Sequence, residues 1–240
     1  MNQSPVNLCG KKIGVIVENK FIPEEIAAYK SAFAILGAEV EFISRIWYGD
    51  WKPASVIFYS DVDPTDSQPW ESPQPLTVNR DISQVKPGDY AAVIMSANYT
   101  SVRLRWWSDD GVNFPYDVTK NFNARDYGRK PPVVSFFADA MRDKSIVKGA
   151  LCHGLWLLTP NPELLEGRTV TCHVVVMADI VNCGANVIVD PLVVTDDDLV
   201  TGFSKHEVLA FIQAIAQRVV EKSDDLSGLA AEPLANKPPK

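Results

Sequence analysis

The hydrophobic pattern of the chain begins with a strand, a helix and a second strand. A β-rich run covers 12–17, apolar residues at helical spacing cover 23–36, and a second β-rich run covers 40–43. Pro23 suits a first helical position, and Gly37 suits a helix end. Two strands joined by one helix at this spacing predict a right-handed βαβ unit, and therefore an open sheet whose strands are mostly parallel.

The same alternation continues along the rest of the chain. Buried strands are expected at 90–95 and 146–151, and helices are expected at 133–142, 174–181 and 205–222. Shorter strands are expected as a pair at 55–59 and 76–80, and also at 187–189, 192–194 and 199–201, while 170–173 is a strand or the end of one. These elements together predict an α/β fold with helices on both faces of the sheet.

Two stretches interrupt the pattern. Residues 44–84 are rich in proline and aromatic side chains, and residues 103–130 are polar and aromatic. A connection as long as the second stretch is typical of a lid, an interface arm or a mobile segment. We predict one domain over 1–225 with insertions near 44–84 and 103–130, followed by a flexible tail over 226–240 that is rich in Pro, Ala and Lys.

The strongest candidate for chemistry lies where the strand at 146–151 ends. Cys152 follows the strand, and a helical pattern begins at Leu155, just beyond Gly154. This arrangement is typical of a nucleophile elbow, in which a tight turn exposes one side chain at the carboxyl end of a strand. A helix N-terminus and the adjacent His153 favour the thiolate, which is the reactive form, so we expect the pKa of Cys152 to be lowered. The alternative is a small buried apolar residue, because free cysteines are often buried.

Charge and composition exclude several classes of function. The 240 residues carry a net charge of -7, with 46% hydrophobic and 22% charged residues. An acidic chain without a basic cluster argues against nucleic-acid binding, and its longest apolar runs fall short of the ~20 residues of a membrane span. Four cysteines in a chain of this size do not indicate a disulfide framework, and the first residues show no apolar secretory signal. We therefore expect a cytoplasmic protein with reduced thiols.

Several stretches resemble the DJ/ThiJ/PfpI superfamily, which is related to class I glutamine amidotransferases. Leu151-Cys152-His153-Gly154 is similar to the Cys-His-Gly elbow of its PfpI-type members, to which the chain is most similar. The segment 165–173 resembles the family's Leu-x-Gly-(Lys/Arg)-x-(Val/Ala)-Thr segment and the residues after it, and 182–185 resembles its Asn-x-Gly-Ala. The resemblance covers roughly 11–43, 85–101 and 132–220, and it implies a flavodoxin-like three-layer α/β sandwich.

The resemblance also implies a set of catalytic residues. Glu25 falls where the family keeps a glutamate near the nucleophile, and His173 matches a histidine that some members carry near the cysteine. The expected catalytic groups are therefore Cys152, Glu25, His153 and His173, and either histidine is a candidate for the base. The backbone N–H groups of His153 and Ala97 are expected to hold a developing oxyanion.

The stretch after the strand at 90–95 departs from the family. Its usual Pro-Gly-Gly is replaced by Met95-Ser96-Ala97, and the acid that a neighbouring subunit supplies in PfpI-type members to orient the histidine falls on Ser101. Asp109, Asp110 and Asp126 remain candidates for that role. The expected substrate-binding residues are Asn98, Ser101 and Arg103; Arg103 and Arg105 are candidates for binding a substrate carboxylate.

Two Cys-His pairs, at 152–153 and 172–173, raise the alternative of a metal site. Adjacent strand residues usually face opposite ways, so four ligands cannot easily converge, and we expect no metal and no cofactor. The leading hypothesis is a cysteine-dependent hydrolase, hydratase or glyoxalase-like enzyme acting on a small carbonyl, amide or nitrile-like molecule. The alternatives are a redox or stress sensor with an oxidisable Cys152, and a catalytically degenerate binding module. The family further implies a homodimer or a higher homo-oligomer.

Overall fold

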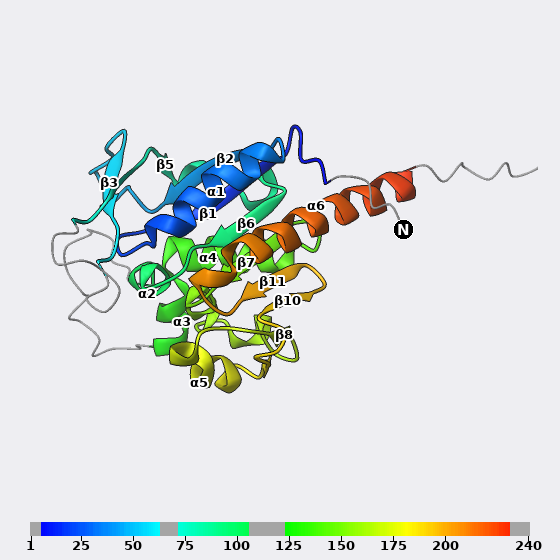
Figure 1. The fold of residues 1–240 in the computed structure, drawn as a ribbon. Helices are drawn as coiled ribbons and strands as arrows, with labels where there is room; N and C mark the ends of the chain where they lie inside the picture. The colour runs from blue at the N-terminus through cyan, green and yellow to red at the C-terminus, as the bar shows by residue number, and fades with distance from the viewer. Residues whose placement is uncertain (1–5, 63–71, 106–122, 231–240) are drawn as a thin grey trace, which may run out of the picture.

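A central sheet of seven strands organises the structure, a computed structural model that describes residues 6–62, 72–105 and 123–230. The strand order is β10-β11-β7-β6-β1-β2-β5 (Figure 1). The bounds are β1 (Lys12–Ile16), β2 (Glu39–Ser44), β5 (Arg80–Asp81), β6 (Ala92–Met95), β7 (Val147–Leu151), β10 (Val193–Asp196) and β11 (Leu199–Gly202). Neighbouring strands are parallel, except that β10 and β11 form an antiparallel hairpin. The predicted, mostly parallel α/β sheet is therefore confirmed.

Helices α1 (Pro23–Ile35) and α6 (Val208–Ala230) cover one face of the sheet (Figure 1). They pack over a buried cluster to which Tyr29 and Phe33 of α1 and Phe211 of α6 contribute. The strands alternate between the two faces, and Ile94 of β6 points into this cluster while its neighbour Val93 points into the other.

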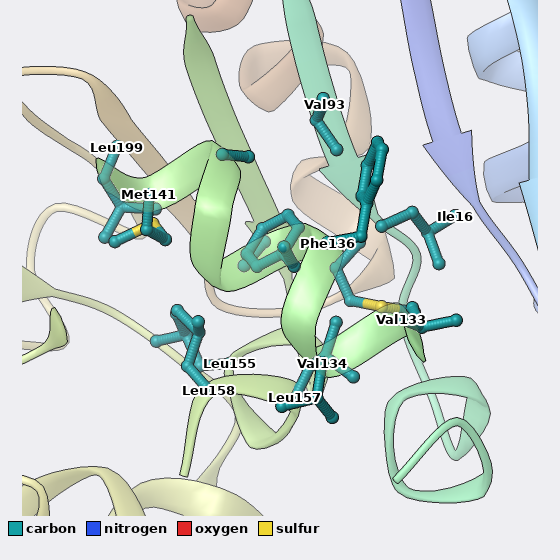
Figure 2. Close-up of a cluster of buried hydrophobic side chains, with 14 of the residues drawn as sticks. Ile16, Val93, Val133, Val134, Phe136, Met141, Leu155, Leu157, Leu158 and Leu199 are labelled. Carbon is teal, nitrogen blue, oxygen red and sulfur yellow. The ribbon is translucent and has the colours of Figure 1, made fainter. Parts of the chain in front are cut away.

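Helix α4 (Pro132–Arg142) and the short 3-10 helix η3 (Gly154–Leu158) cover the opposite face. Figure 2 shows this second cluster, in which Phe136 and Met141 of α4 gather with Leu155 of η3 and with Val93 of the sheet. The two clusters complete the three-layer sandwich.

Short elements connect these layers. They are α2 (Thr100–Arg103), α3 (Ala124–Arg129), α5 (Val174–Asn182), the strand pairs β3 (Val56–Tyr59) with β4 (Pro75–Val78) and β8 (Thr169–Val170) with β9 (Asn186–Val187), and the 3-10 helices η1 (Ile82–Gln84), η2 (Pro87–Asp89), η4 (Pro162–Leu164) and η5 (Lys205–Glu207). The strand pair expected at 55–59 and 76–80 is confirmed as an antiparallel hairpin, β3 with β4. Arg80 lies instead in β5, which joins the central sheet beside β2.

Several element boundaries differ from the predictions, and two of them change the description of the elbow and of the C-terminal segment. The strand β7 leads into the 3-10 helix η3 rather than an α-helix, because Pro160 and Pro162 follow too closely for a longer helix. Helix α6 extends to Ala230, so it overlaps the segment 226–240 for which the sequence predicts a flexible tail. No helix in the described part of the chain combines the length and the apolar character needed to cross a bilayer.

Gly149 in the middle of β7 lets α6 approach the sheet. A Cβ atom there would lie 2.7 Å from Ile215 Cδ1 and 2.8 Å from Phe211 Cζ. We expect Gly149→Ala to lower the free energy of unfolding by about 1–3 kcal/mol, because the packed layer must shift. Urea denaturation checks this, with Gly88→Ala as the matched control, since a Cβ at Gly88 meets nothing within 4 Å. Equal stability of the two variants would contradict this account of the packing.

Candidate active site

Cys152 lies in a strained turn at the carboxyl end of β7. Its backbone has φ of 58°, a left-handed conformation that non-glycine residues rarely adopt. The turn is held by two backbone hydrogen bonds, from Cys152 N–H to the Gly202 carbonyl at 2.8 Å and from His173 N–H to the Cys152 carbonyl at 3.2 Å. Gly154 then passes β6 so closely that a Cβ would lie 3.0 Å from the Met95 carbonyl oxygen. This is the geometry of the predicted nucleophile elbow.

Glu25 is fully buried beside this turn, on the first turn of α1. Its carboxyl group accepts a hydrogen bond from Tyr29 Oη at 2.7 Å, and the Ala97 N–H lies 3.0 Å from each carboxyl oxygen. Burial raises the pKa of Glu25 to about 7, although both hydrogen bonds act to lower it. The carboxyl group therefore exchanges its proton near neutral pH.

The backbone N–H groups of Asn98 and His153 face the sulfur. Their hydrogen bonds act to lower the pKa of Cys152. The His153 N–H stays the predicted oxyanion donor, whereas the Ala97 N–H expected beside it is engaged by Glu25. The physical reason is the turn after β6, in which Asn98 takes φ of 64° and brings its own N–H to the sulfur. Asparagine tolerates this conformation better than most residues, and here it follows the position of the family's glycines.

The expectation of a lowered pKa at Cys152 is wrong. Burial raises the pKa of this thiol to about 12, and the charge of an ionised Glu25 raises it further, against the two N–H groups. The short η3 offers little of the dipole of a full helix, and His153 supplies no positive charge because burial lowers its pKa to about 4. The resting form of Cys152 is therefore the thiol, with Glu25 as its neighbouring proton acceptor.

The two histidines lie together, with His153 buried and His173 partly exposed. His153 Nε2 is 3.2 Å from His173 Nδ1, and the rings meet edge to face with centroids 4.9 Å apart. Because the N–H of Val175 also donates to His173 Nδ1, we assign that nitrogen as the acceptor and His153 Nε2 as the N–H donor. His153 also stacks on Trp156, with centroids 5.4 Å apart, and lies against Tyr99.

The residue that would orient His153 is not a described carboxylate. The ring of His153 interacts with His173 and with the backbone of Asn98, and its Nδ1 makes no hydrogen bond within the described ranges. Asp126 is an exposed residue of α3. Asp109 and Asp110 lie outside the described residues.

The three predicted substrate-binding residues have different environments. Ser101 is fully buried and donates its hydroxyl to the His153 carbonyl at 2.9 Å, so it supports the turn instead of facing a substrate. The Asn98 side chain is also engaged within the protein. Arg103 has half of its side chain exposed, 3.6 Å from Glu18, and stays a candidate for binding a substrate carboxylate.

Asp61 is a site residue that the sequence did not reveal. Its carboxylate accepts a hydrogen bond from Asn98 Nδ2 at 3.0 Å and pairs with Lys20 Nζ at 2.8 Å, while Asn98 Nδ2 also donates to the Lys20 carbonyl at 2.9 Å. These contacts hold the Asn98 turn in place. The sequence shows no sign of this role, because Asp61 comes from the insertion near 44–84.

We expect Asp61→Ala to slow Cys152 chemistry about tenfold by releasing the Asn98 N–H, with KM little changed. The measurement is kcat and KM, or the alkylation rate of Cys152 if no substrate is in hand. Asp61→Asn should recover part of the loss because it retains an acceptor, and Lys20→Gln, which leaves Asp61 bonded to Asn98, should have little effect. Equal losses in Asp61→Ala and Lys20→Gln would assign the effect to the ion pair instead.

Three of the four residues of the two Cys-His pairs converge. One ligand atom from each of Cys152, His153 and His173 lies within 4.8 Å of the others, whereas Cys172 is not part of this group. Adjacent Cys152 and His153 reach the same side because the left-handed turn ends the strand alternation on which the sequence argument relied.

The structure is an α/β sandwich with a cysteine at the carboxyl end of a central strand. The cysteine lies beside backbone N–H groups and a buried glutamate. Residues 122–218 match the model of the DJ-1/PfpI family. An uncharacterized protein of Staphylococcus haemolyticus is 26% identical over 209 residues, covering 87% of this chain and 98% of that protein.

Two solved structures show the same fold. The ThiJ/PfpI domain protein of Brachyspira murdochii has a TM-score of 0.63 at 14% identity, covering 89% of this chain and 98% of that chain. A protein of Anabaena variabilis with DJ-1/ThiJ/PfpI-like and ferritin-like domains has a TM-score of 0.64 at 18% identity, covering 88% of this chain and 48% of that chain. The chain thus spans about half of that two-domain protein. The chain shares the fold of these proteins, and its residues 122–218, which include the Cys152 elbow, match the DJ-1/PfpI family model.

Proposed function

We propose that the protein is a cysteine-dependent enzyme acting on a small carbonyl, amide or nitrile-like substrate. One observation carries the proposal: the strained Cys152 presents its sulfur to two backbone N–H groups beside a fully buried carboxyl group. A structural cysteine needs neither a left-handed backbone nor converging donors. Stored strain of this kind is typical of nucleophiles.

In the proposed first step, the proton of the Cys152 thiol moves to the Glu25 carboxylate. The sulfur then forms a bond to the substrate carbon, and the π electrons of the C=O or C≡N bond move to the oxygen or nitrogen. In this proposal the N–H groups of Asn98 and His153, which face the sulfur, stabilise the charge that develops there. Protonated Glu25, or the N–H of a histidine, returns the proton.

The replacement of the family's Gly-Gly does not argue for a degenerate site. Asn98, which follows the position of those glycines, adopts a positive φ, and its N–H reaches the sulfur. The loss of the partner acid at Ser101 is the stronger departure, because the buried Ser101 hydroxyl supports the backbone of His153 instead of its ring. This favours Glu25 over His153 as the group that first accepts the thiol proton.

The test is turnover of a panel of small 2-oxoaldehydes, amides and nitriles by the wild-type protein and by Cys152→Ser. Turnover of one class that Cys152→Ser loses supports the proposal and identifies the substrate class. Turnover that survives in Cys152→Ser, or none with any class, would contradict it. Cys9→Ser is the control, because Cys9 is exposed and lies outside the site.

A redox sensor is the second candidate, and the buried Glu25 favours it. A protonated carboxyl group close to the sulfur can donate a hydrogen bond to an oxygen of a sulfinate at Cys152. Mass spectrometry after mild peroxide treatment separates the two functions: selective oxidation of Cys152 without any turnover favours the sensor. The homo-oligomer stays a prediction, which light scattering tests.

A further inference from the structure

The cluster of Cys152, His153 and His173 is a set of soft ligand atoms at one place. A sulfur and a nitrogen from each ring lie within 4.8 Å of one another. A tetrahedral zinc ion, with Zn–S near 2.3 Å and Zn–N near 2.0 Å, separates its ligand atoms by roughly 3.3–3.6 Å. The ligand atoms therefore need to approach one another by only about 1 Å to hold such an ion.

The backbone brings the three ligands together independently of any ion. The strained turn at Cys152 is tied to the start of α5 by the hydrogen bond from His173 N–H to the Cys152 carbonyl, at 3.2 Å. Cys152 and His153 are both more than nine-tenths buried, while His173 is partly exposed. The backbone thus holds the two buried ligands in place, and the partly exposed His173 completes the set.

His153 adds an independent observation. Its Nδ1 is buried and has no hydrogen-bond partner in the described part of the chain. A buried polar atom without a partner is costly, and such atoms in native proteins are often bonded to water or an ion. His153 Nε2 lies 3.2 Å from His173 Nδ1, and the unpartnered Nδ1 can hold the ring proton when Nε2 binds an ion.

We propose that Cys152, His153 and His173 form a binding site for Zn²⁺. One thiolate and two imidazoles are a donor set that zinc prefers, whereas Mg²⁺ and Ca²⁺ need oxygen ligands, which this group lacks. Binding forms one Zn–S and two Zn–N bonds and releases one proton, that of the Cys152 thiol. A fourth position remains for water.

The consequence for activity rests on the proposed function. A sulfur that is bonded to zinc cannot attack a substrate carbon, so zinc would hold the enzyme in a reversibly inactive form. A chelator would restore activity because no covalent bond of the protein is changed.

The experiment is a titration of the chelator-treated full-length protein with Co²⁺, followed by its absorbance. We expect one Co²⁺ per chain with a thiolate-to-cobalt charge-transfer band, which one equivalent of Zn²⁺ displaces and millimolar Mg²⁺ does not. Cys152→Ser should lose the band, and His173→Gln should weaken binding at least about tenfold, as expected for loss of one ligand. His206→Gln, at the third histidine of the chain, is the matched control and should bind as the wild type does. Circular dichroism verifies that each variant is folded.

The site would be refuted by a wild-type protein without the charge-transfer band, or by a folded His173→Gln that binds Co²⁺ as tightly as the wild type. Because the readout needs no substrate, it separates the two proposals. A cobalt band in a protein that shows no turnover would contradict the proposed enzymatic function and still support the metal site. Turnover that is unaffected by Zn²⁺ at concentrations that saturate the site would contradict the proposed inhibition by zinc.

Discussion

Cys152→Ser lowers turnover by at least about 10³-fold while leaving the fold intact, since the serine hydroxyl is a far weaker nucleophile in the same position. Serine is nearly the same size and adopts the left-handed turn at similar cost, so the N–H groups of Asn98 and His153 stay in place. The measurement is kcat/KM on the substrate found in the panel, with thermal unfolding of both proteins.

Cys172→Ser is the matched control for this prediction. Cys172 is also fully buried, belongs to the other buried cluster, and acts on the pKa of Cys152 only through its charge. It has no part in the proposed chemistry, so its substitution should affect stability more than turnover. Comparable losses of turnover in both variants would indicate a general loss of packing. They would contradict the proposal that Cys152 is the nucleophile.

Glu25→Gln is expected to lower turnover and to raise stability at the same time. Turnover falls about 10²–10⁴-fold, the range for loss of a general acid or base. Stability rises above neutral pH because glutamine resembles the protonated acid and never carries a buried charge. Activity and stability therefore change in opposite directions, which a merely structural role of Glu25 would not produce.

The pH dependence of this stability difference follows from the pKa of Glu25. Its folded value of about 7 lies above the ordinary 4.5, so the folded state holds the proton more tightly. The stability that the protonated group contributes is present below pH 4.5 and is lost as the pH rises through 7. The wild type should therefore lose about 2–3 kcal/mol relative to Glu25→Gln between pH 5 and pH 8.

Urea denaturation at the two pH values checks this expectation. Glu24→Gln is the matched control, because Glu24 lies on the same first turn of α1 but is exposed. It should show no comparable change between pH 5 and pH 8. A stability difference between the wild type and Glu25→Gln that does not vary with pH would contradict the raised pKa.

The sequence predicted the framework because its information is local. The apolar runs and the helical spacing identify the strands of the sheet and the helices α1, α4 and α6, each from its own residues. The position of Cys152 at the end of β7 is likewise local, as is the placing of Glu25 in the first turn of α1 beside a neighbouring strand. The approach of Glu25 to Cys152 followed from the resemblance to the family.

The parts that the sequence missed depend on contacts between distant segments. Asp61 contacts Asn98, which lies 37 positions away in the chain, and no local sequence pattern predicts that contact. The donor expected at Ala97 is displaced by one residue because the turn angle at Asn98 is set by these contacts. The pKa of Cys152 was predicted in the wrong direction because burial, its largest cause, depends on the packing of α1 and α6 around the turn.

The central claim is that Glu25 accepts the proton of a resting Cys152 thiol, and the alkylation rate of Cys152 tests it most directly. The rate is measured with iodoacetamide against pH, in the presence of a chelator, for the wild type and for Glu25→Gln. We predict a rise in the wild-type rate with a midpoint near pH 7, where the carboxylate becomes available, and the absence of this step in Glu25→Gln. The same profile in both proteins, or a wild-type thiol already fully reactive at pH 5, would contradict the account.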